Sequence, residues 1–366
     1  MLSPLNYRKN KNKNPYIYEY KINKVNNYRE DKNIAKIAKN LLKTQSGCCL
    51  LKEKLSNNYF ANELLFPEIK SNIKEICCSI IGSSFINCLL DVLSYENIDS
   101  FLSLINEDLF EICLTEPGSR VIQKLIEIIN NFPLLLNKFI FDLSCKDIGF
   151  IIKSQYGNHI FRTYLSLVKK EEYTNFIYYY IFYDFLGIMQ EKYGICVIIK
   201  ALSEANENKK KKIFEIILKY FMKIIKNSYG NYLIQHLFLK YEKKNFKEML
   251  PFIQKIEENI VDYCKCQYSS SVIEKCIEKG EKEISEHLVK YLLDYHLNSI
   301  IDIIDNSYGV YVIIKALKIN NKNLKDSIIQ FIANNIYKFK KGNVIKIISS
   351  LSVKNKEIYD KFCKQK

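Results

Sequence analysis

The stretch SYGNYLIQHL, residues 228–237, recurs in edited form along the chain. QYGNHIFRTYL begins at Gln155, KYGICVIIKAL at Lys192 and SYGVYVIIKAL at Ser307. Related segments of this length indicate a structural unit that is copied along the chain and changed at a few positions.

Aligned on the small residue within this stretch, the copies number eight and lie 35 to 40 residues apart. The small residues, which number the repeats in chain order, are Gly47, Gly82, Gly118, Gly157, Gly194, Gly230, Ser269 and Gly309. This period is typical of solenoids, whose units must stack because none of them buries its apolar face alone.

Each unit contains an amphipathic stretch, a short polar and aromatic break, and a second amphipathic stretch. KKIFEIILKYFMKII, from Lys211, is an example of the first stretch. In the second stretch Leu233, Ile234 and Leu237 fall on one helical stripe, so the sequence predicts an all-α array with two or more helices per unit. The small residue before the second helix suits either a close approach of two backbones or a positive φ.

The ends of the chain depart from the repeat. Residues 1–32 contain YRKNKNKNP and show little apolar periodicity, so we expect a basic tail or partial cap there and the repeat domain over residues 33–366. KGNVIKIISSL, from Lys341, has the pattern of a degenerate repeat that would close the stack.

The chain is basic, with a formal net charge of +15. Its first forty residues hold ten Lys and Arg side chains against three acidic ones. This balance favours polyanionic partners, nucleic acid first and anionic membrane second, although a solvated Lys-rich surface would have the same composition. Only four of the 55 basic residues are arginines, namely Arg8, Arg29, Arg120 and Arg162.

Composition also argues against several classes of protein. The longest apolar run, about residues 176–189, is broken by Asp184 and is too short to span a bilayer. The twelve cysteines follow no regular framework, so we expect reduced thiols in an intracellular protein. The four histidines and the Cys264/Cys266 pair form no nucleophile or zinc pattern, so we expect no enzyme, no metal and no cofactor.

Three positions vary from repeat to repeat: the first, second and fifth residues after the small residue. The first and fifth lie four apart on a helix and share a face, with the second beside them. Stacked repeats would align these positions into a ladder. Polar side chains at such regular spacing are what base-by-base reading of RNA requires.

YGNYLIQ (residues 229–235) and YSSSVIEKC (residues 268–276), within eight such units, resemble the Pumilio homology domain of the PUF family of RNA-binding proteins. The resemblance covers about residues 33–366. It implies a right-handed α-solenoid crescent of about eight Pumilio-type repeats with degenerate capping repeats. Its concave face would bind single-stranded RNA antiparallel to the chain, one base per repeat. First and fifth residues would bond the base edge, and second residues would stack between bases.

Carried over to this sequence, the resemblance assigns bases to some repeats. The sixth repeat, with Asn231 and Gln235 on the base edge and Tyr232 stacking, matches the uracil pattern. The seventh, with Ser270, Glu274 and Ser271, matches the guanine pattern, because a carboxylate accepts from N1–H and the exocyclic amine together. The third, with Ser119, Gln123 and the stacking Arg120, matches the adenine pattern. The fourth has Asn158 and His159 as in uracil readers but Arg162 in place of Gln, which leaves its base open.

The other four repeats have no assigned base. The fifth repeat has Ile195, Cys196 and Ile199 at these positions, and the eighth has Val310, Tyr311 and Ile314. Their aliphatic first and fifth residues cannot hydrogen-bond a base edge, although Tyr311 can stack. Ser83, Ser84 and Asn87 in the second repeat, and Cys48, Cys49 and Lys52 in the first, match no pattern. Read 5′ to 3′, repeats eight to one give ?-G-U-?-U-A-?-?, in which the U of repeat four is provisional; this string fits the UGUA-containing elements typical of the family.

We therefore expect a cytoplasmic, monomeric protein that binds UGUA-type elements in mRNA 3′ untranslated regions. It would reduce translation or stability through recruited protein effectors such as deadenylation or repression factors. One alternative is a divergent nucleolar PUF-like protein that binds pre-rRNA in ribosome biogenesis, which the aliphatic fifth and eighth repeats and the basic tail favour. Another is a helical scaffold that binds protein.

Overall fold

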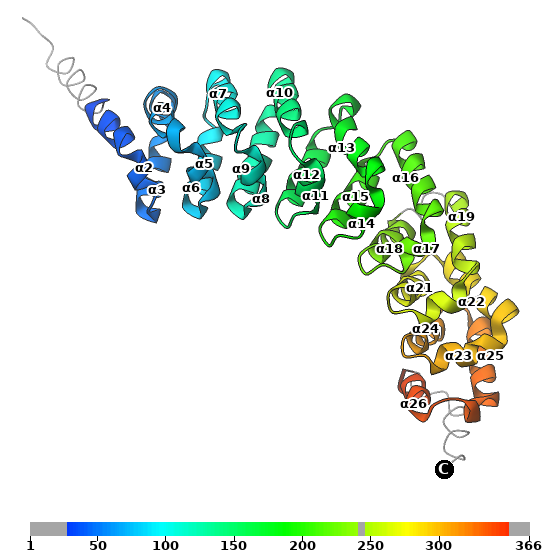
Figure 1. Ribbon diagram of the computed structural model, residues 1–366. Coiled ribbons are helices and arrows are strands. Elements are labelled where there is room, and N and C mark those ends of the chain that lie inside the picture. The colour runs from blue at the N-terminus through cyan, green and yellow to red at the C-terminus, as the bar shows by residue number, and fades with distance from the viewer. Residues whose placement is uncertain (1–27, 241–245, 351–366) are drawn as a thin grey trace, which may run out of the picture. The chain divides into compact units, whose positions relative to one another are not determined.

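The computed structural model describes residues 28–240 and 246–350, which form helices joined by short turns, with no strand among them (Figure 1). The all-α prediction is confirmed. Residues 1–27 and 351–366, which include most of the predicted tail, lie outside the described residues. Helix already runs over residues 28–36, before the expected start at residue 33, and Asp31 there forms an ion pair of 2.7 Å with Lys54.

Packing groups the chain into two compact units: residues 1–151 with 155–173, and residues 152–154 with 174–366. The ladder positions of repeats one to four belong to the first unit and those of repeats five to eight to the second.

Each repeat contains a first helix, a short middle helix and a last helix that carries the variable positions, which we call the ladder helix. In the first unit the first helices are residues 28–36, the run η1 (Phe60–Leu65), α4 (Phe66–Ile69) and η2 (Lys70–Asn72), α7 (Tyr95–Ile105) and α10 (Pro133–Ser144). The middle helices are α2 (Ala38–Leu41), α5 (Ile73–Cys78), α8 (Leu109–Leu114) and α11 (Ile148–Lys153), whose last two residues group with the second unit. The ladder helices are α3 (Gln45–Lys54), α6 (Ile80–Leu90), α9 (Glu116–Ile129) and α12 (Gly157–Leu167).

The second unit repeats this order. Its first helices are α13 (Glu171–Tyr183), α16 (Glu207–Lys219), α19 (Phe246–Glu257), α22 (Lys282–His296) and α25 (Lys322–Asn334). The middle helices are α14 (Phe185–Met189), α17 (Phe221–Ile225), α20 (Ile260–Lys265), α23 (Ile300–Asp305) after η3 (Leu297–Ser299), and η4 (Ile336–Lys338). The ladder helices are α15 (Gly194–Glu204), α18 (Asn231–Lys240), α21 (Gln267–Lys279) and α24 (Gly309–Ala316), followed by the closing helix α26 (Lys341–Ser350).

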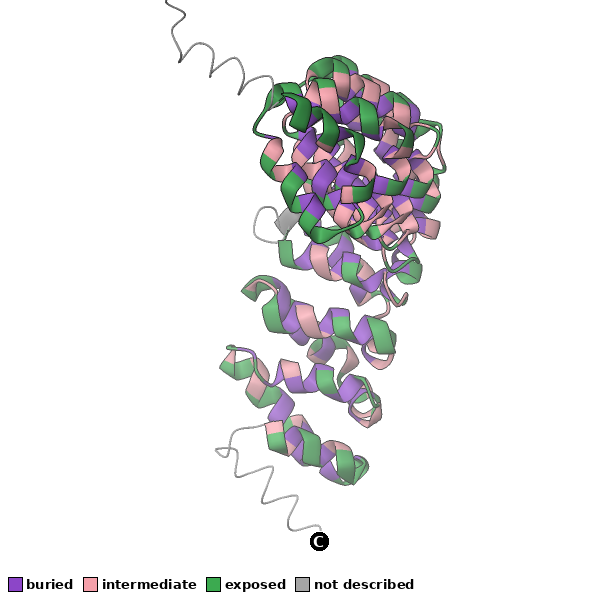
Figure 2. Ribbon diagram, turned by 90° about the vertical axis from the view of Figure 1, so that its left-hand side faces the viewer, coloured by how far each residue is buried: buried purple, intermediate pink, exposed green. Residues whose placement is uncertain are grey.

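Ladder helices pack on one another in chain order. In the first unit α3, α6, α9 and α12 form one row, and in the second unit α15, α18, α21, α24 and α26 form another. Buried and exposed residues alternate along each helix, as Figure 2 shows, because one apolar stripe faces the neighbouring helices. The closing helix packs on α24.

The small residue that marks each repeat lies where the ladder helix crosses the end of the middle helix. A Cβ at Gly82 or Gly118 would overlap the carbonyl oxygen of the residue six positions earlier, and no described glycine has a positive φ. Close approach, rather than backbone conformation, therefore explains the glycine. In repeat seven Ser269 occupies this place, and its Oγ donates a hydrogen bond of 2.8 Å to the carbonyl six residues earlier, that of Tyr263.

A cap residue three positions before the small residue starts most ladder helices. Thr44, Ser79 and Thr115 each accept a hydrogen bond from the backbone N–H of the following glycine, at 2.9 to 3.1 Å. Asn227 and Asn306 do the same through Oδ1. These bonds satisfy N–H groups that have no partner within the helix, and so fix where the variable positions begin.

The described residues include no helix that is both long and apolar enough to cross a membrane. Within the same ranges no cluster of three or more His, Cys, Asp or Glu side chains is arranged to hold a metal ion. Every cysteine in the described chain is a free thiol, and burial raises the pKa of Cys264 to about 12, which fits a structural role for the Cys264/Cys266 pair.

Candidate nucleic-acid interface

The variable positions have the same surroundings in nearly every repeat. The first is buried in all eight ladder helices, the second is exposed except at Cys196, and the fifth is partly exposed except at Ile314. The two residues between them are buried core, with Leu50 as the exception. The shared register expected from the sequence is therefore present within each unit, while the contacts of these residues with RNA stay a prediction.

Burial of the first position was not expected from the sequence. Asn158, Asn231 and Ser270 are at most 3% exposed, as are Ser119 and Cys48, and Ser83 is 5% exposed. Ladder helices pack on one another within each unit, and the second and fifth residues form most of the accessible ladder.

In repeat six the first residue holds the fifth. The Nδ2 of Asn231 donates to the carbonyls of Asn227 and Ser228, both at 2.9 Å, and its Oδ1 accepts from Nε2 of Gln235 at 2.9 Å. Tyr232 beside them is 55% exposed. An amide that is oriented in advance and an open phenol ring thus lie together, as a uracil reader needs.

Repeat seven presents a carboxylate in a desolvated place. Ser270 donates its hydroxyl to the carbonyl of Gln267 at 3.3 Å, and Ser271 is exposed. Burial raises the pKa of Glu274; the nearby Lys315 opposes the rise, and Glu278 adds to it. Among the described residues this partly buried carboxylate forms no ion pair within 4 Å, so both of its oxygens can accept donors from a base.

In repeat three the amide of Gln123 is fixed from both ends. Its Nε2 donates to the carbonyl of Ser119 at 3.1 Å, and its Oε1 accepts from Oγ1 of Thr163 on the next ladder helix at 2.9 Å. Arg120 is exposed and forms a 2.7 Å ion pair with Glu116, one turn earlier. Its guanidinium plane is therefore anchored at the surface and available for stacking.

In repeat four His159 is exposed and Arg162 is partly exposed. Partial burial, with Arg162 as a second cause, lowers the pKa of His159, which favours the neutral imidazole. The Arg162 guanidinium offers only donors, and the uracil N3–H would find no acceptor on it.

Repeats one and two are joined through their ladder residues. Nζ of Lys52, the fifth residue of repeat one, donates to Oγ of Ser84, the second residue of repeat two, at 2.8 Å. Asn87, the fifth residue of repeat two, has a buried Oδ1 with no hydrogen-bond partner among the described residues. Cys48 is buried, and Cys49 beside it is exposed.

In repeats five and eight the first residues, Ile195 and Val310, are buried, as is Ile314, and Ile199 is partly exposed. Tyr311 is 43% exposed, and Nζ of Lys346 from the closing helix lies 5.2 Å from its ring centroid. Sequence reasoning missed Lys346, because the closing helix has lost the repeat register: Gly342 lies in open space, unlike the junction glycines.

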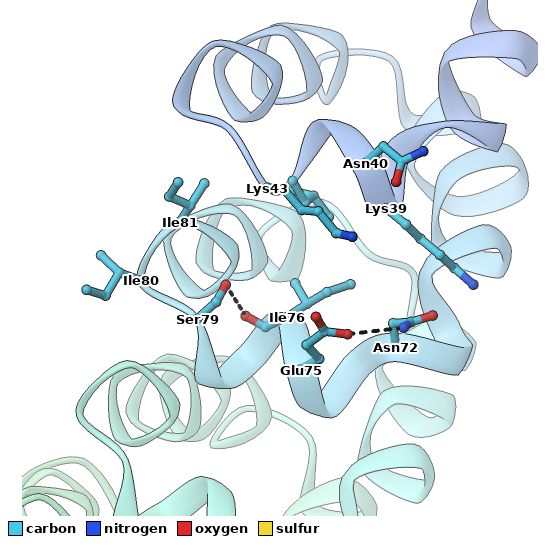
Figure 3. A pocket seen from close by; sticks show the side chains of 10 residues that line it. Lys39, Asn40, Lys43, Asn72, Glu75, Ile76, Ser79, Ile80 and Ile81 are labelled. Atoms are coloured by element: carbon cyan, nitrogen blue, oxygen red, sulfur yellow. Dashed lines mark hydrogen bonds between the residues drawn. The ribbon is translucent and has the colours of Figure 1, made fainter.

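The first unit also contains a cavity of about 660 Å³ between α2, α5 and the start of α6 (Figure 3). Lys39 and Lys43 lie on one side, and Glu75, Ile76 and Ile80 on the other. None of the ladder residues lines it, so the cavity is separate from the candidate interface.

Within each unit the three-helix repeats stack into an α-solenoid, and their ladder helices carry the variable positions. The family model of the Pumilio-family RNA binding repeat, PUF, matches residues 118–131, 184–218, 220–241 and 259–293, which lie in repeats three, five, six and seven and in the first helix of repeat eight. These matches support a Pumilio homology domain of the PUF family, to whose repeats the matched segments are similar.

Curated proteins that are similar in sequence to this chain include Pumilio proteins of yeast and plants. A Pumilio domain-containing protein of Schizosaccharomyces pombe is 25% identical over 279 residues, 75% of this chain and 39% of the relative. Pumilio homolog 12 of Arabidopsis thaliana is 24% identical over 323 residues, 86% of this chain and 52% of the relative. The chain thus spans about half or less of these relatives.

Among solved structures, the Puf4 RNA binding domain bound to an HO endonuclease RNA 3′ UTR recognition sequence superposes with a TM-score of 0.77. It is 24% identical in sequence, and the match covers 85% of this chain and 97% of that domain. This likeness confirms the helical-solenoid fold.

Proposed function

We propose that the chain binds single-stranded RNA in a sequence-specific way, with the ladder residues of each unit facing successive bases. The observation that carries the proposal is the constant surroundings of the variable positions: their burial repeats from helix to helix while their chemistry changes. If the variable positions served only in packing, their chemistry would be expected to be as constant as their burial. The RNA-bound Puf4 domain, which has the same fold, supports this proposal.

The base preferences follow from the side chains. In the second unit repeat seven takes guanine through Glu274, and repeat six takes uracil through Gln235 and Tyr232. In the first unit repeat three takes adenine through Gln123 and Arg120. A UGUA-type element is the RNA that best accommodates these preferences. Stacking contributes about 1–3 kcal/mol per base, and surface lysines attract the phosphates.

We further propose that the natural targets are such elements in mRNA 3′ untranslated regions, and that bound messages are repressed through recruited protein factors in the cytoplasm. The Puf4 domain bound to a 3′ UTR recognition sequence supports the target class. We expect a monomer, because every ladder position is supplied by this chain.

Selection of bound RNA from a random pool tests the whole proposal. An enriched core containing GU followed by UA at the predicted spacing supports it. Weak enrichment would instead favour shape-led binding of pre-rRNA, which the apolar ladder positions of repeats five and eight would suit. No enrichment, together with no RNA binding, would favour a protein-binding scaffold.

Glu274→Gln tests the guanine assignment. A carboxylate accepts from both N1–H and the exocyclic amine of guanine, whereas an amide has one acceptor oxygen. Equilibrium binding is measured with UGUAUA RNA that carries guanosine, inosine or adenosine at its second position. We expect the protein's preference for guanosine over the other two to fall about tenfold or more. Equal losses on all three RNAs would refute the assignment.

Glu278→Gln is the matched control for that experiment. Glu278 lies one turn further along α21, and its Oε1 pairs with Lys315 at 2.5 Å. Because Glu278 is outside the ladder, its replacement leaves both acceptor oxygens of Glu274 in place, and we expect the guanosine preference to change far less than in Glu274→Gln.

A further inference from the structure

The stacking residue of repeat eight is covered on one side by a lysine. Tyr311 is the second residue of that repeat, and Nζ of Lys346 lies 5.2 Å from its ring centroid. Lys346 is exposed on α26, which packs on α24 from the side opposite α21. An ammonium at this distance over a phenol ring is a cation–π contact.

The two sides of the Tyr311 ring therefore have different neighbours. Toward α21 the nearest stacking position is Ser271, which is exposed and has no ring. A guanine held by Glu274 would find its aromatic neighbour in Tyr311. Toward α26 a further base would have to stack where Lys346 lies.

Repeat eight has nothing else to offer a base. Val310 is fully buried and Ile314 is 8% exposed, and neither side chain has a hydrogen-bonding atom. No carboxylate in the described chain lies within ion-pair distance of Lys346, so its charge is not neutralised there. What remains at this position is a cation held on an aromatic ring.

We propose that repeat eight and the closing helix bind a phosphate of the RNA backbone through Lys346, and that the nucleotide 5′ of the guanine is not read. The base-reading part of the second unit then begins at guanine. This inference rests on the proposed function and on an RNA that runs antiparallel to the chain. Its ligand is a phosphodiester, and the contact is independent of sequence.

An abasic nucleotide provides the first test. In UGUAUA RNA the first uracil is removed from its sugar while the phosphates stay in place, and affinity is measured by fluorescence anisotropy. We expect less than a twofold change, and equal affinity for U, A, C and G at that position. A loss of tenfold or more on removal of this base would overturn the inference.

Lys346→Ala provides the second test. We expect affinity to fall by a similar factor for all four bases at the first position, and the slope of log affinity against log salt to become shallower by about 0.7, the value for one phosphate of a single strand. Because the mutation frees the ring face of Tyr311, affinity should also become sensitive to the abasic change. An unchanged salt slope would contradict the phosphate contact.

Lys338→Ala is the matched control. Lys338 is exposed in η4 of the same capping repeat, and its Nζ lies 5.5 Å from the ring centroid of Tyr337. The pair is chemically the same but lies outside the ladder helices, so we expect neither the affinity nor the salt slope to change.

Failure of this inference is distinguishable from failure of the proposed function. An abasic nucleotide in place of the second uracil, which repeat six is proposed to hold on Tyr232, should reduce binding at least tenfold. If that loss occurs and removal of the first base is equally harmful, RNA reading stands and the phosphate site is wrong. If unmodified UGUAUA does not bind at all, the proposed function fails.

Discussion

At the scale of single residues, ionisation of Glu274 is unfavourable for the stability of the fold but is needed for the proposed recognition of guanine. Burial raises its pKa, so the folded protein holds a proton on this carboxyl more tightly than the unfolded chain does. At neutral pH the ionised group therefore costs stability, and the cost is relieved as pH falls through the raised pKa. The same ionised form is the one that would accept two hydrogen bonds from guanine under the proposed function.

We predict that acidification weakens binding of guanine-containing RNA at a pH above the ordinary glutamate range of about 4.3. Affinity for UGUAUA measured between pH 7 and pH 5 should fall relative to affinity for the RNA with adenine in place of guanine. Glu274→Gln should abolish this relative change, and its Tm at pH 7 should be at least that of the natural chain. A pH-independent preference for guanine would contradict the prediction.

The sequence locates the ladder positions in each repeat, because their spacing from the small residue is a local property of one helix, while their contacts with RNA stay a prediction. It did not show that Asn231 and Ser270 are buried, nor that Lys52 bonds Ser84. Those facts depend on how neighbouring repeats pack. Lys346 was missed for the same reason, since it reaches Tyr311 from a helix more than thirty residues further along the chain.

At the scale of helices, the sequence predicted two or more per repeat, and the structure has three in most. The middle helices, such as α8 and α11, are only six residues long. A window this short holds too few turns for a helical period to emerge, and it reads as a break between the longer helices. By contrast, the glycine at the junction of the middle and ladder helices, such as Gly82, is evident from the sequence. Close packing against the middle helix tolerates few other residues there, so the glycine recurs in nearly every repeat.

We predict that Gly82→Ala lowers the free energy of unfolding by about 1–3 kcal/mol. The added Cβ would overlap the carbonyl oxygen of Ile76 and the Oγ of its own cap, Ser79, so α5 and α6 would have to move apart. Urea unfolding followed by circular dichroism measures the change.

Gly342→Ala is the control for the junction glycine. It lies in the first turn of α26 with no heavy atom within 4 Å of an added Cβ. There alanine should leave stability unchanged or raise it by up to about 1 kcal/mol, since it restricts the unfolded chain. If both substitutions had the same effect, the packing explanation for the junction would be wrong.

At the scale of the whole molecule, the proposed RNA binding involves two properties with different ranges. A net charge of +15 would attract phosphates regardless of sequence, while the ladder residues of each unit would discriminate between bases only in contact. Ion pairs on the described surface, such as Lys74 with Asp108 and Lys138 with Asp99, neutralise part of the lysine charge, and the unpaired remainder supplies the attraction.

These two contributions should separate in a salt titration. Each phosphate contact of a single strand adds about 0.7 to the negative slope of log affinity against log salt, so raising salt should weaken binding to every RNA. The ratio of affinities for UGUAUA and for the RNA with adenine in place of guanine should stay constant, because the hydrogen bonds to Glu274 release no extra counterions. Equilibrium binding at several salt concentrations measures both quantities. A ratio that falls with salt would mean that the guanine preference is itself electrostatic, and a slope near zero would mean that the basic surface does not contact the RNA backbone.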